Sequence, residues 1–354
     1  NPVEIPTGAV RYNTDSNKME VYIGSAWMEV AVSTPDLGNS DAGARGLIMG
    51  GNSPGAPNSG RLNNIEYVTI TSAGNSQDFG DLTSVGRSST GSCASRTRGL
   101  AMGGFDESAP AYRDIIDFVT ISSTGNATDF GNLTINRQPP CSFSNATRGC
   151  CAGGYAIAPL ISPNQNMTTI DFVTIAAEGN AVTFGDMTVG YRSRDAVQSP
   201  TRGIMAGGYG SLGDESKVID FVTIATTGNA QDFGDIGSKF TSYAQNGYGN
   251  ATRGVFPLCD SNDSGNYKCD TLDFITLSTL GKITEYGDLT TSRAIACSFS
   301  NPTRGILVAG ASPDSDDIDY NNIATGGTSV DFGEYSAYSK LSAASGCSNA
   351  HGGL

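Results

Sequence analysis

Residues 98–133 read RGLAMGGFDESAPAYRDIIDFVTISSTGNATDFGNL, and this stretch decides the fold. It begins with an Arg-Gly dipeptide and a short apolar run that ends in Gly-Gly, which is typical of a strand followed by a turn. The next run, IDFVTI from Ile116, is rich in β-branched and aromatic residues and predicts a second strand. A turn at Thr124–Asn126 then leads into DFGN, which predicts a third short strand carrying one aromatic residue.

The same pattern occurs six times, at a spacing of roughly 50 residues, which is the length of a kelch repeat. The Arg-Gly dipeptides begin at Arg45, Arg98, Arg148, Arg202, Arg253 and Arg304. The DFG-like segments carry Phe79, Phe130, Phe184, Phe233 and Phe332, and a tyrosine replaces the phenylalanine in the fifth repeat. Because these residues recur in every repeat, we predict structural roles for them. The arginines are expected to bond carbonyls or carboxylates, and the phenylalanines to pack between neighbouring repeats.

A basic residue, such as Arg137 or Arg192, opens each following unit and leads into a small-residue segment such as CSFSN from Cys141. This segment predicts a fourth strand. It is missing before Arg45, whereas the C-terminus carries it at Lys340–Asn349, so we expect the C-terminal strand to complete the first sheet.

Four short strands cannot bury both of their faces alone, so such units must stack on their neighbours. Radial closure of six units leaves few exposed edges. The sequence therefore predicts an all-β fold, a six-bladed kelch-like β-propeller over residues 34–354 that is closed by the C-terminal strand. Residues 1–33 stand outside the repeats, and Gly8–Val30 predicts a small β-meander with the single tryptophan, Trp27.

The N-terminal motif resembles a short segment of tail-fibre and other appendage proteins of tailed bacteriophages. The repeat words GNAxDFGDLT, IDFVTI and TRGxxxGG, with the C-terminal NAHGGL, resemble virion structural proteins of marine phages, especially cyanophages. The resemblance implies a virion protein that is assembled in the host cytoplasm and exposed outside the cell. It also implies that other virion proteins bind the N-terminal segment, and that the propeller serves adhesion, decoration or docking on a host-surface glycan, a receptor or another virion protein.

Composition limits the classes of partner. The net charge of −14 repels phosphate backbones and no basic run offsets it, so nucleic acid is not expected as a partner. The sequence has no run of about 18 apolar residues, so insertion into a membrane is not expected. Most of the eight cysteines are expected to be small buried residues, whereas Cys259 and Cys269 flank a polar tip and could close a hairpin by a disulfide in an oxidising medium. The oligomeric state stays open.

Few residues suggest chemistry. The only histidine, His351, cannot build a multi-histidine metal site or a relay, and DFG recurs without the other motifs of a kinase. A carboxylate recurs at the second position of every IDFVTI-like strand, from Glu66 and Asp117 onwards, and we interpret it as a structural partner of an arginine or of turn amides. Asp260–Gly265 and Asp314–Asp317 are interpreted as polar hairpin tips. We expect no catalytic residue, cofactor or metal.

Variation between the repeats is confined to the segments after Gly-Gly, which predicts a binding surface on one face. Four tyrosines of these loops are candidate contacts for a glycan or protein: Tyr112, Tyr155, Tyr209 and Tyr267. The alternative is that they pack their own loops. The favoured function is non-enzymatic binding in a virion. A glycan-active, glycosidase-like propeller enzyme is the main alternative, and an intracellular kelch adaptor is a third.

Overall fold

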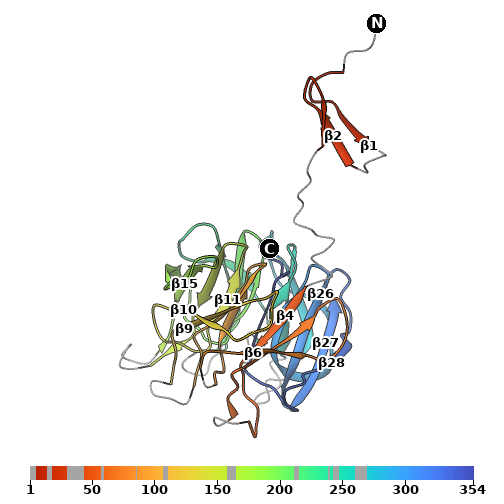
Figure 1. The fold of residues 1–354 in the computed structure, drawn as a ribbon. Coiled ribbons are helices and arrows are strands. Elements are labelled where there is room, and N and C mark those ends of the chain that lie inside the picture. Colours follow the sequence, from red (N-terminus) through yellow and green to blue (C-terminus); the bar gives the residue numbers. More distant parts are fainter. Residues whose placement is uncertain are drawn as a thin grey trace. The chain divides into compact units, whose positions relative to one another are not determined.

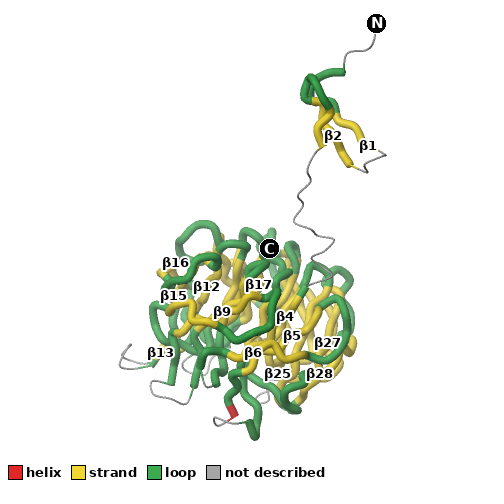
Figure 2. Tube along the Cα trace, viewed as in Figure 1, coloured by secondary structure: helices red, strands yellow, loops and turns green. Residues whose placement is uncertain are grey.

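The computed structural model describes residues 5–13, 18–29, 44–56, 60–84, 86–106, 111–157, 165–210, 215–237, 240–241, 247–259 and 269–354. Its regular elements are antiparallel strands joined by turns and loops; apart from a short 3₁₀ turn at Gly60, which Figure 2 draws in red, no helix occurs in these ranges. The predicted all-β class is therefore confirmed. The chain divides into two compact units, Asn1–Ala42 and Gly43–Leu354. Residues 30–43 lie outside the described residues, so a boundary between 33 and 34 stays a prediction.

The first unit contains the expected meander. Strands β1 (Val10–Asn13), β2 (Lys18–Tyr22) and β3 (Trp27–Glu29) pair in this order as an antiparallel sheet. The second unit holds all of the repeats, and its sheets are built from strands that are mostly neighbours in sequence.

Four sheets of the second unit have four strands each. They are, in spatial order: β29 (Ser345–Ser348), β4 (Arg45–Met49), β5 (Asn64–Thr69) and β6 (Gln77–Asp81); β7 (Gly91–Ala94), β8 (Arg98–Met102), β9 (Ile115–Thr120) and β10 (Thr128–Asn132); β11 (Cys141–Ser144), β12 (Arg148–Ala152), β15 (Thr169–Thr174) and β16 (Val182–Asp186); β17 (Asp195–Gln198), β18 (Arg202–Ala206), β19 (Val218–Thr223) and β20 (Gln231–Asp235). A small hairpin, β13 (Tyr155–Ala156) and β14 (Gln165–Asn166), lies in a loop of the third sheet.

The last two repeats share one larger sheet because the 17-residue strand β25 runs through both. Its strands are β21 (Phe240–Thr241), β22 (Tyr248–Gly249), β23 (Arg253–Cys259), β24 (Cys269–Thr276), β25 (Thr284–Ser300), β26 (Arg304–Ala311), β27 (Ser315–Asn322) and β28 (Val330–Glu334). The backbone register pairs Cys259 with Cys269. Their side chains lie outside the described part of the chain, so a disulfide between them stays a prediction.

The Gly-Gly pair explains where the strand that begins with Arg-Gly ends. In the first four repeats the Arg-Gly strand stops after five residues at two glycines with positive φ, such as Gly103 (63°) and Gly104 (103°), a conformation that favours glycine. The fifth repeat has VFPLC instead, and β23 continues for seven residues. Without the two glycines, the Arg-Gly strand of the fifth repeat therefore extends two residues further than those of the first four.

The C-terminal strand β29 pairs with β4, with Cys347 opposite Leu47. This is the pairing that the two ends of the repeats predict. In addition, the side-chain oxygen of Asn349 accepts a hydrogen bond of 2.9 Å from the backbone N–H of Arg45, 304 residues earlier. The first sheet also lies beside β26–β28, and the two share one apolar cluster that includes Ile48 and Ile306 (Figure 1).

The small-residue strands lie next to one another in the order β29, β7, β11, β17, β22 and β25, and β25 in turn lies next to β29. Small residues make this approach possible. The glycine after each repeat arginine faces a side chain from the small-residue strand of the preceding sheet: a Cβ added to Gly203 would lie 2.2 Å from the ring of Phe143. Gly305 stands in the same relation to the ring of Tyr248, at 1.9 Å. The Arg-Gly glycines therefore leave room for the neighbouring sheet.

The glycines of the DFG segments are needed at the other edge of each sheet. The register of β9 and β10 shifts next to Gly131, which has a φ of 146°. A Cβ at this position would lie 2.5 Å from the carbonyl oxygen of Gly179, in a turn of the next sheet. That turn also donates to the DFG strand, since the N–H of Gly179 bonds the carbonyl of Phe130 at 2.8 Å. The DFG glycine thus allows neighbouring sheets to make backbone hydrogen bonds.

Substitution of Gly131 by alanine is expected to lower the free energy of unfolding by about 3 kcal/mol, because backbone strain and a collision with Gly179 act together. Gly125 provides a matched control. Its φ is 156°, but nothing lies within 4 Å of an added Cβ. Gly125→Ala should cost only about 1 kcal/mol. Thermal and urea unfolding of both variants will measure the difference, and equal losses would contradict the role given to the contact.

Candidate functional site

The repeat arginines join neighbouring sheets. Arg148 donates from Nη1 to the carbonyl oxygen of Ile224 in the next sheet at 3.0 Å, and its guanidinium lies 4.7 Å from the ring centroid of Phe172 in its own sheet. The other five likewise bond a carbonyl of a neighbouring repeat and contact a ring of their own repeat: Arg45 with Ile121 and Tyr67, Arg98 with Ile175 and Phe118, Arg202 with Leu277 and Phe221, Arg253 with Ile323 and Phe274, and Arg304 with Ile70 and Tyr320.

The phenylalanines of the DFG segments lie in the same layer of contacts. Phe130 is 3% exposed and meets Phe118 edge to face, with 5.8 Å between the ring centroids. Phe79, Phe184, Phe233 and Phe332 are buried likewise. The phenylalanines are therefore buried and the arginines half-buried, and both make contacts within and between sheets.

Four buried ion pairs connect the start of a unit to its IDFVTI-like strand: Arg87–Asp117, Arg137–Asp171, Arg194–Asp220 and Arg293–Asp319. In the fourth repeat the paired residue is Arg194, two positions after the basic residue singled out from the sequence, Arg192. Asp171 also accepts from Thr134 at 2.8 Å, so this carboxylate has several donors. The pairs orient the connection between sheets, and nothing about them indicates catalysis.

Replacement of Asp171 by asparagine should lower the free energy of unfolding by about 3–5 kcal/mol, because the guanidinium of Arg137 then stays buried without a counter-charge. Glu66 occupies the same strand position but bonds the hydroxyl of Ser76. Burial, the largest influence, raises its pKa. The matched variant Glu66→Gln should therefore change stability by only about 1 kcal/mol. Urea unfolding compares the two, and a small loss in Asp171→Asn would count against the pair.

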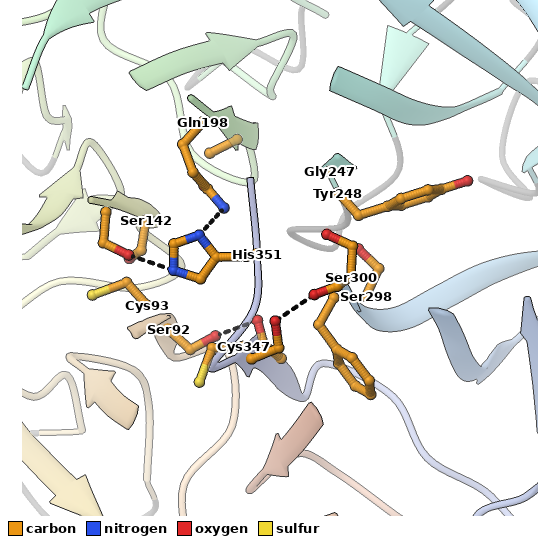
Figure 3. Close-up of a pocket in the computed structure, with 15 residues that line it drawn as sticks. Ser92, Cys93, Ser142, Gln198, Gly247, Tyr248, Ser298, Ser300, Cys347 and His351 are labelled. Carbon is orange, nitrogen blue, oxygen red and sulfur yellow. Dashed lines mark hydrogen bonds between the residues drawn. The ribbon is translucent and has the colours of Figure 1, made fainter. Parts of the chain in front are cut away.

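A polar cavity of about 40 Å³ lies where the small-residue strands of all sheets converge (Figure 3). Its walls carry the hydroxyls of Ser92, Ser142, Ser298, Ser300 and Ser348. This volume has room for about three water molecules and is too small for a sugar ring. The cavity therefore fits bound water better than a substrate.

His351, near the C-terminus, lines this cavity. His351 is 5% exposed and lies between Gln198 and the serine side of the cavity (Figure 3). Its Nε2 lies 2.8 Å from the carbonyl oxygen of Ala94, so this nitrogen carries the proton. Nδ1 accepts from the N–H of Gly353 at 3.0 Å and lies 3.2 Å from the side-chain nitrogen of Gln198. The imidazole is a neutral part of the core.

Burial lowers the pKa of His351 to about 4. In the unfolded chain His351 binds a proton near pH 6.5, whereas in the folded chain it stays neutral down to about pH 4. The free energy of unfolding therefore falls as the pH falls from 6.5 towards 4. The loss through this group should reach about 3 kcal/mol. Urea unfolding across this range will show a weaker pH dependence in His351→Gln. Parallel curves for the two proteins would refute the assignment, because every other titratable group is common to both.

A different surface gathers the candidate tyrosines. We call it the aromatic–arginine row, and it consists of Arg61, Phe105, Tyr112, Tyr155, Arg192 and Tyr209. All six side chains are half-buried. They lie in the loops after Gly-Gly or in the connection between sheets, at the opposite strand ends from His351. Tyr267, the fourth candidate, lies outside the described residues.

The row is continuous across consecutive sheets. The guanidinium of Arg61 lies 4.4 Å from the ring centroid of Phe105, and the Phe105 and Tyr112 rings are 5.7 Å apart. Tyr112 and Tyr155 follow at 6.3 Å. The guanidinium of Arg192 then stands 5.0 Å from the Tyr155 ring and 5.6 Å from that of Tyr209.

Hydrogen bonds fix the backbone beneath these rings. The guanidinium of Arg113 donates two hydrogen bonds, of 2.6 and 2.9 Å, to the carboxylate of Asp106, and these residues are next to Phe105 and Tyr112 in the sequence. Asn136 donates to the carbonyl of Tyr112 at 2.8 Å, and Asn166 to that of Tyr209 at 3.0 Å. The rings are therefore held before any ligand arrives.

The sequence reasoning missed Arg61, Phe105 and Arg192 as members of this surface. A signal was present for Phe105, because an aromatic residue directly follows Gly-Gly in three consecutive repeats, at Phe105, Tyr155 and Tyr209. Arg192 was assigned to the framework by its place in the repeat. Its contact with two tyrosines depends on the approach of adjacent sheets, which sequence spacing does not give.

Two further observations concern the described residues. No three or more histidine, cysteine, aspartate or glutamate side chains among them are grouped so as to hold a metal ion. Nor do these ranges contain a helix with the length and apolar character needed to span a membrane.

Comparison with known proteins gives a likeness of fold. No family model matches the chain, and no curated protein matches it. Among solved structures, the chain is similar to one described as the structure of YjhT, with a TM-score of 0.55 and 10% sequence identity. The alignment covers 74% of this chain and 89% of YjhT. At this identity the likeness concerns the fold and carries no information on what the chain binds.

Proposed function

We propose that Gly43–Leu354 form a six-bladed, kelch-like β-propeller that acts as a non-enzymatic binding module of a phage virion. The order of the small-residue strands supports the propeller. It begins with β29 and ends with β25, and these two strands also lie next to each other, as a closed ring of sheets requires. The likeness to YjhT, which has a fold of the β-propeller type, is a second support. The virion assignment rests on the phage-like words in the repeats and in the N-terminal unit, which we propose attaches to the particle.

The aromatic–arginine row is the observation that carries the binding function. Three tyrosines and a phenylalanine present ring surface that is already ordered, so little side-chain entropy is lost when a ligand binds. Flat apolar rings stack on the C–H faces of sugars. Arg61 and Arg192 add guanidinium groups that can donate to carboxylates or hydroxyls.

The charge of the row favours an acidic glycan. The chain as a whole carries −14 and would repel an anion, whereas the row has two arginines. An acidic polysaccharide of the host surface is therefore the ligand that fits it best. By contrast, the cavity beside His351 is small, and we assign it no turnover.

The binding function can be tested on an array of acidic and neutral bacterial surface polysaccharides. The full chain should bind acidic members, and Tyr155→Ala and Arg192→Ala should each weaken binding by about 10- to 100-fold. Val182→Ala serves as the control, because Val182 is 54% exposed on the outer strand β16 of the sheet whose loop carries Tyr155. Equal binding by all variants, or no binding to any glycan, would contradict this role for the row.

The same incubations separate binding from catalysis. Mass spectrometry of the bound oligosaccharides should find them unchanged, and detectable cleavage would favour the glycosidase-like alternative. The virion assignment has its own test. Proteomic analysis of purified particles should find the chain, and its absence there would remove the virion from the proposal while leaving the binding test intact.

A further inference from the structure

The two faces of the N-terminal sheet differ in chemistry. Residues paired across an antiparallel sheet share a face, and residues alternate between faces along a strand. The register therefore places five apolar residues on one face, which we call the apolar face: Val10, Tyr12, Met19, Val21 and Met28. The opposite face carries Arg11, Asn13, Glu20, Tyr22 and Trp27.

The polar face is held by its own side chains. Arg11 and Asn13 donate to the carboxylate of Glu20 at 2.7 and 2.9 Å, and these two hydrogen bonds lower the pKa of Glu20. The guanidinium of Arg11 also lies 4.2 Å from the ring of Trp27, which packs against Tyr22 at 5.4 Å. This face has its partners within the sheet.

The apolar face is the more exposed of the two. Val10 is 58% exposed, Tyr12 56%, Met28 51% and Met19 42%, whereas Trp27 and Tyr22 on the polar face are half-buried. A three-stranded sheet with an apolar face meets the minimum for stability, and covering that face would remove further apolar surface from water. Exposed apolar groups of this kind mark surfaces that bind another protein.

We propose that the apolar face of the N-terminal unit packs against the same face of a second copy of this chain, as two stacked β-sheets. The face carries no charged side chain, so two copies meet there without repulsion between their faces. A two-fold contact between identical patches also matches apolar surface to apolar surface in every copy. Stacked sheets lie about 10 Å apart, which leaves both sets of side chains in one shared core.

The area of the apolar face is small, which favours a weak and reversible dimer. The four exposed side chains, with roughly 100 Å² each, give about 400 Å² per copy, and the half-buried Val21 adds less; two copies bury roughly 850 Å². This lies below the standard size of specific interfaces, so the dimer should be weak and form at roughly tens of micromolar or above. Each copy carries a charge of −14, and added salt should strengthen association by screening the repulsion between the two chains.

Sedimentation velocity of the full chain, from low micromolar to submillimolar concentration, tests this proposal. The wild type should shift from the 36.5 kDa monomer towards twice that mass. The double variant Val10→Asp/Met28→Asp should remain monomeric throughout. A matched control, Val182→Asp/Val330→Asp, changes valines that are 54% and 52% exposed on β16 and β28, and should associate like the wild type.

Because the substitutions could unfold the N-terminal unit, a second measurement tests the proposal on the wild-type chain. Dilute peroxide should oxidise Met19 and Met28 several-fold more slowly at high protein concentration, while Met187, which is 3% exposed, reacts slowly at both. A wild type that stays monomeric at every concentration and salt would overturn the proposal, as would association that survives in Val10→Asp/Met28→Asp. Capture of another virion protein by a monomeric chain, lost in that variant, would assign the apolar face to that protein instead. These outcomes are independent of glycan binding by the row.

Discussion

The Arg-Gly dipeptide at the start of the second strand of each sheet is the contact on which the rest of the second unit depends. Its glycine admits a side chain from the preceding sheet, as Gly203 admits Phe143. Its arginine bonds a carbonyl of the following sheet, as Arg202 bonds Leu277. One dipeptide therefore fixes three consecutive sheets, and its sixfold recurrence sets the same spacing all along the chain.

The residues that make these repeated contacts between neighbouring sheets are those that could be predicted from the sequence. Arg-Gly, IDFVTI and DFG recur because every sheet meets its neighbours in the same way, so repetition alone separates framework from variable residues. The pairing of β29 with β4 could be predicted as well, because one small-residue strand is missing at the start and an extra one stands at the end. The buried partner Arg194 was missed, because Arg192, two positions earlier, fits the repeat spacing equally well.

The candidate surface was predicted only in part, for a physical reason. Tyr112, Tyr155 and Tyr209 are far apart in the sequence and could be grouped by their place after Gly-Gly. Their order, and the arginines beside them, depend on the distance between loops of adjacent sheets. The burial of His351 was unpredictable for a similar reason, because the turn after β29 brings it against β7, β11 and β17. Neither arrangement leaves a local signal in the sequence.

The bond between Arg45 and Asn349 has a consequence for how the chain is made. The two residues are separated by 304 positions, so at a translation rate of 5–20 residues per second the first sheet waits roughly 15–60 s for its last strand. During that time the edge of β4 has unpaired backbone groups that any free strand can join. A chain interrupted before Ser345 would keep this edge open, and aggregation of such fragments would follow from incomplete synthesis rather than from weak packing.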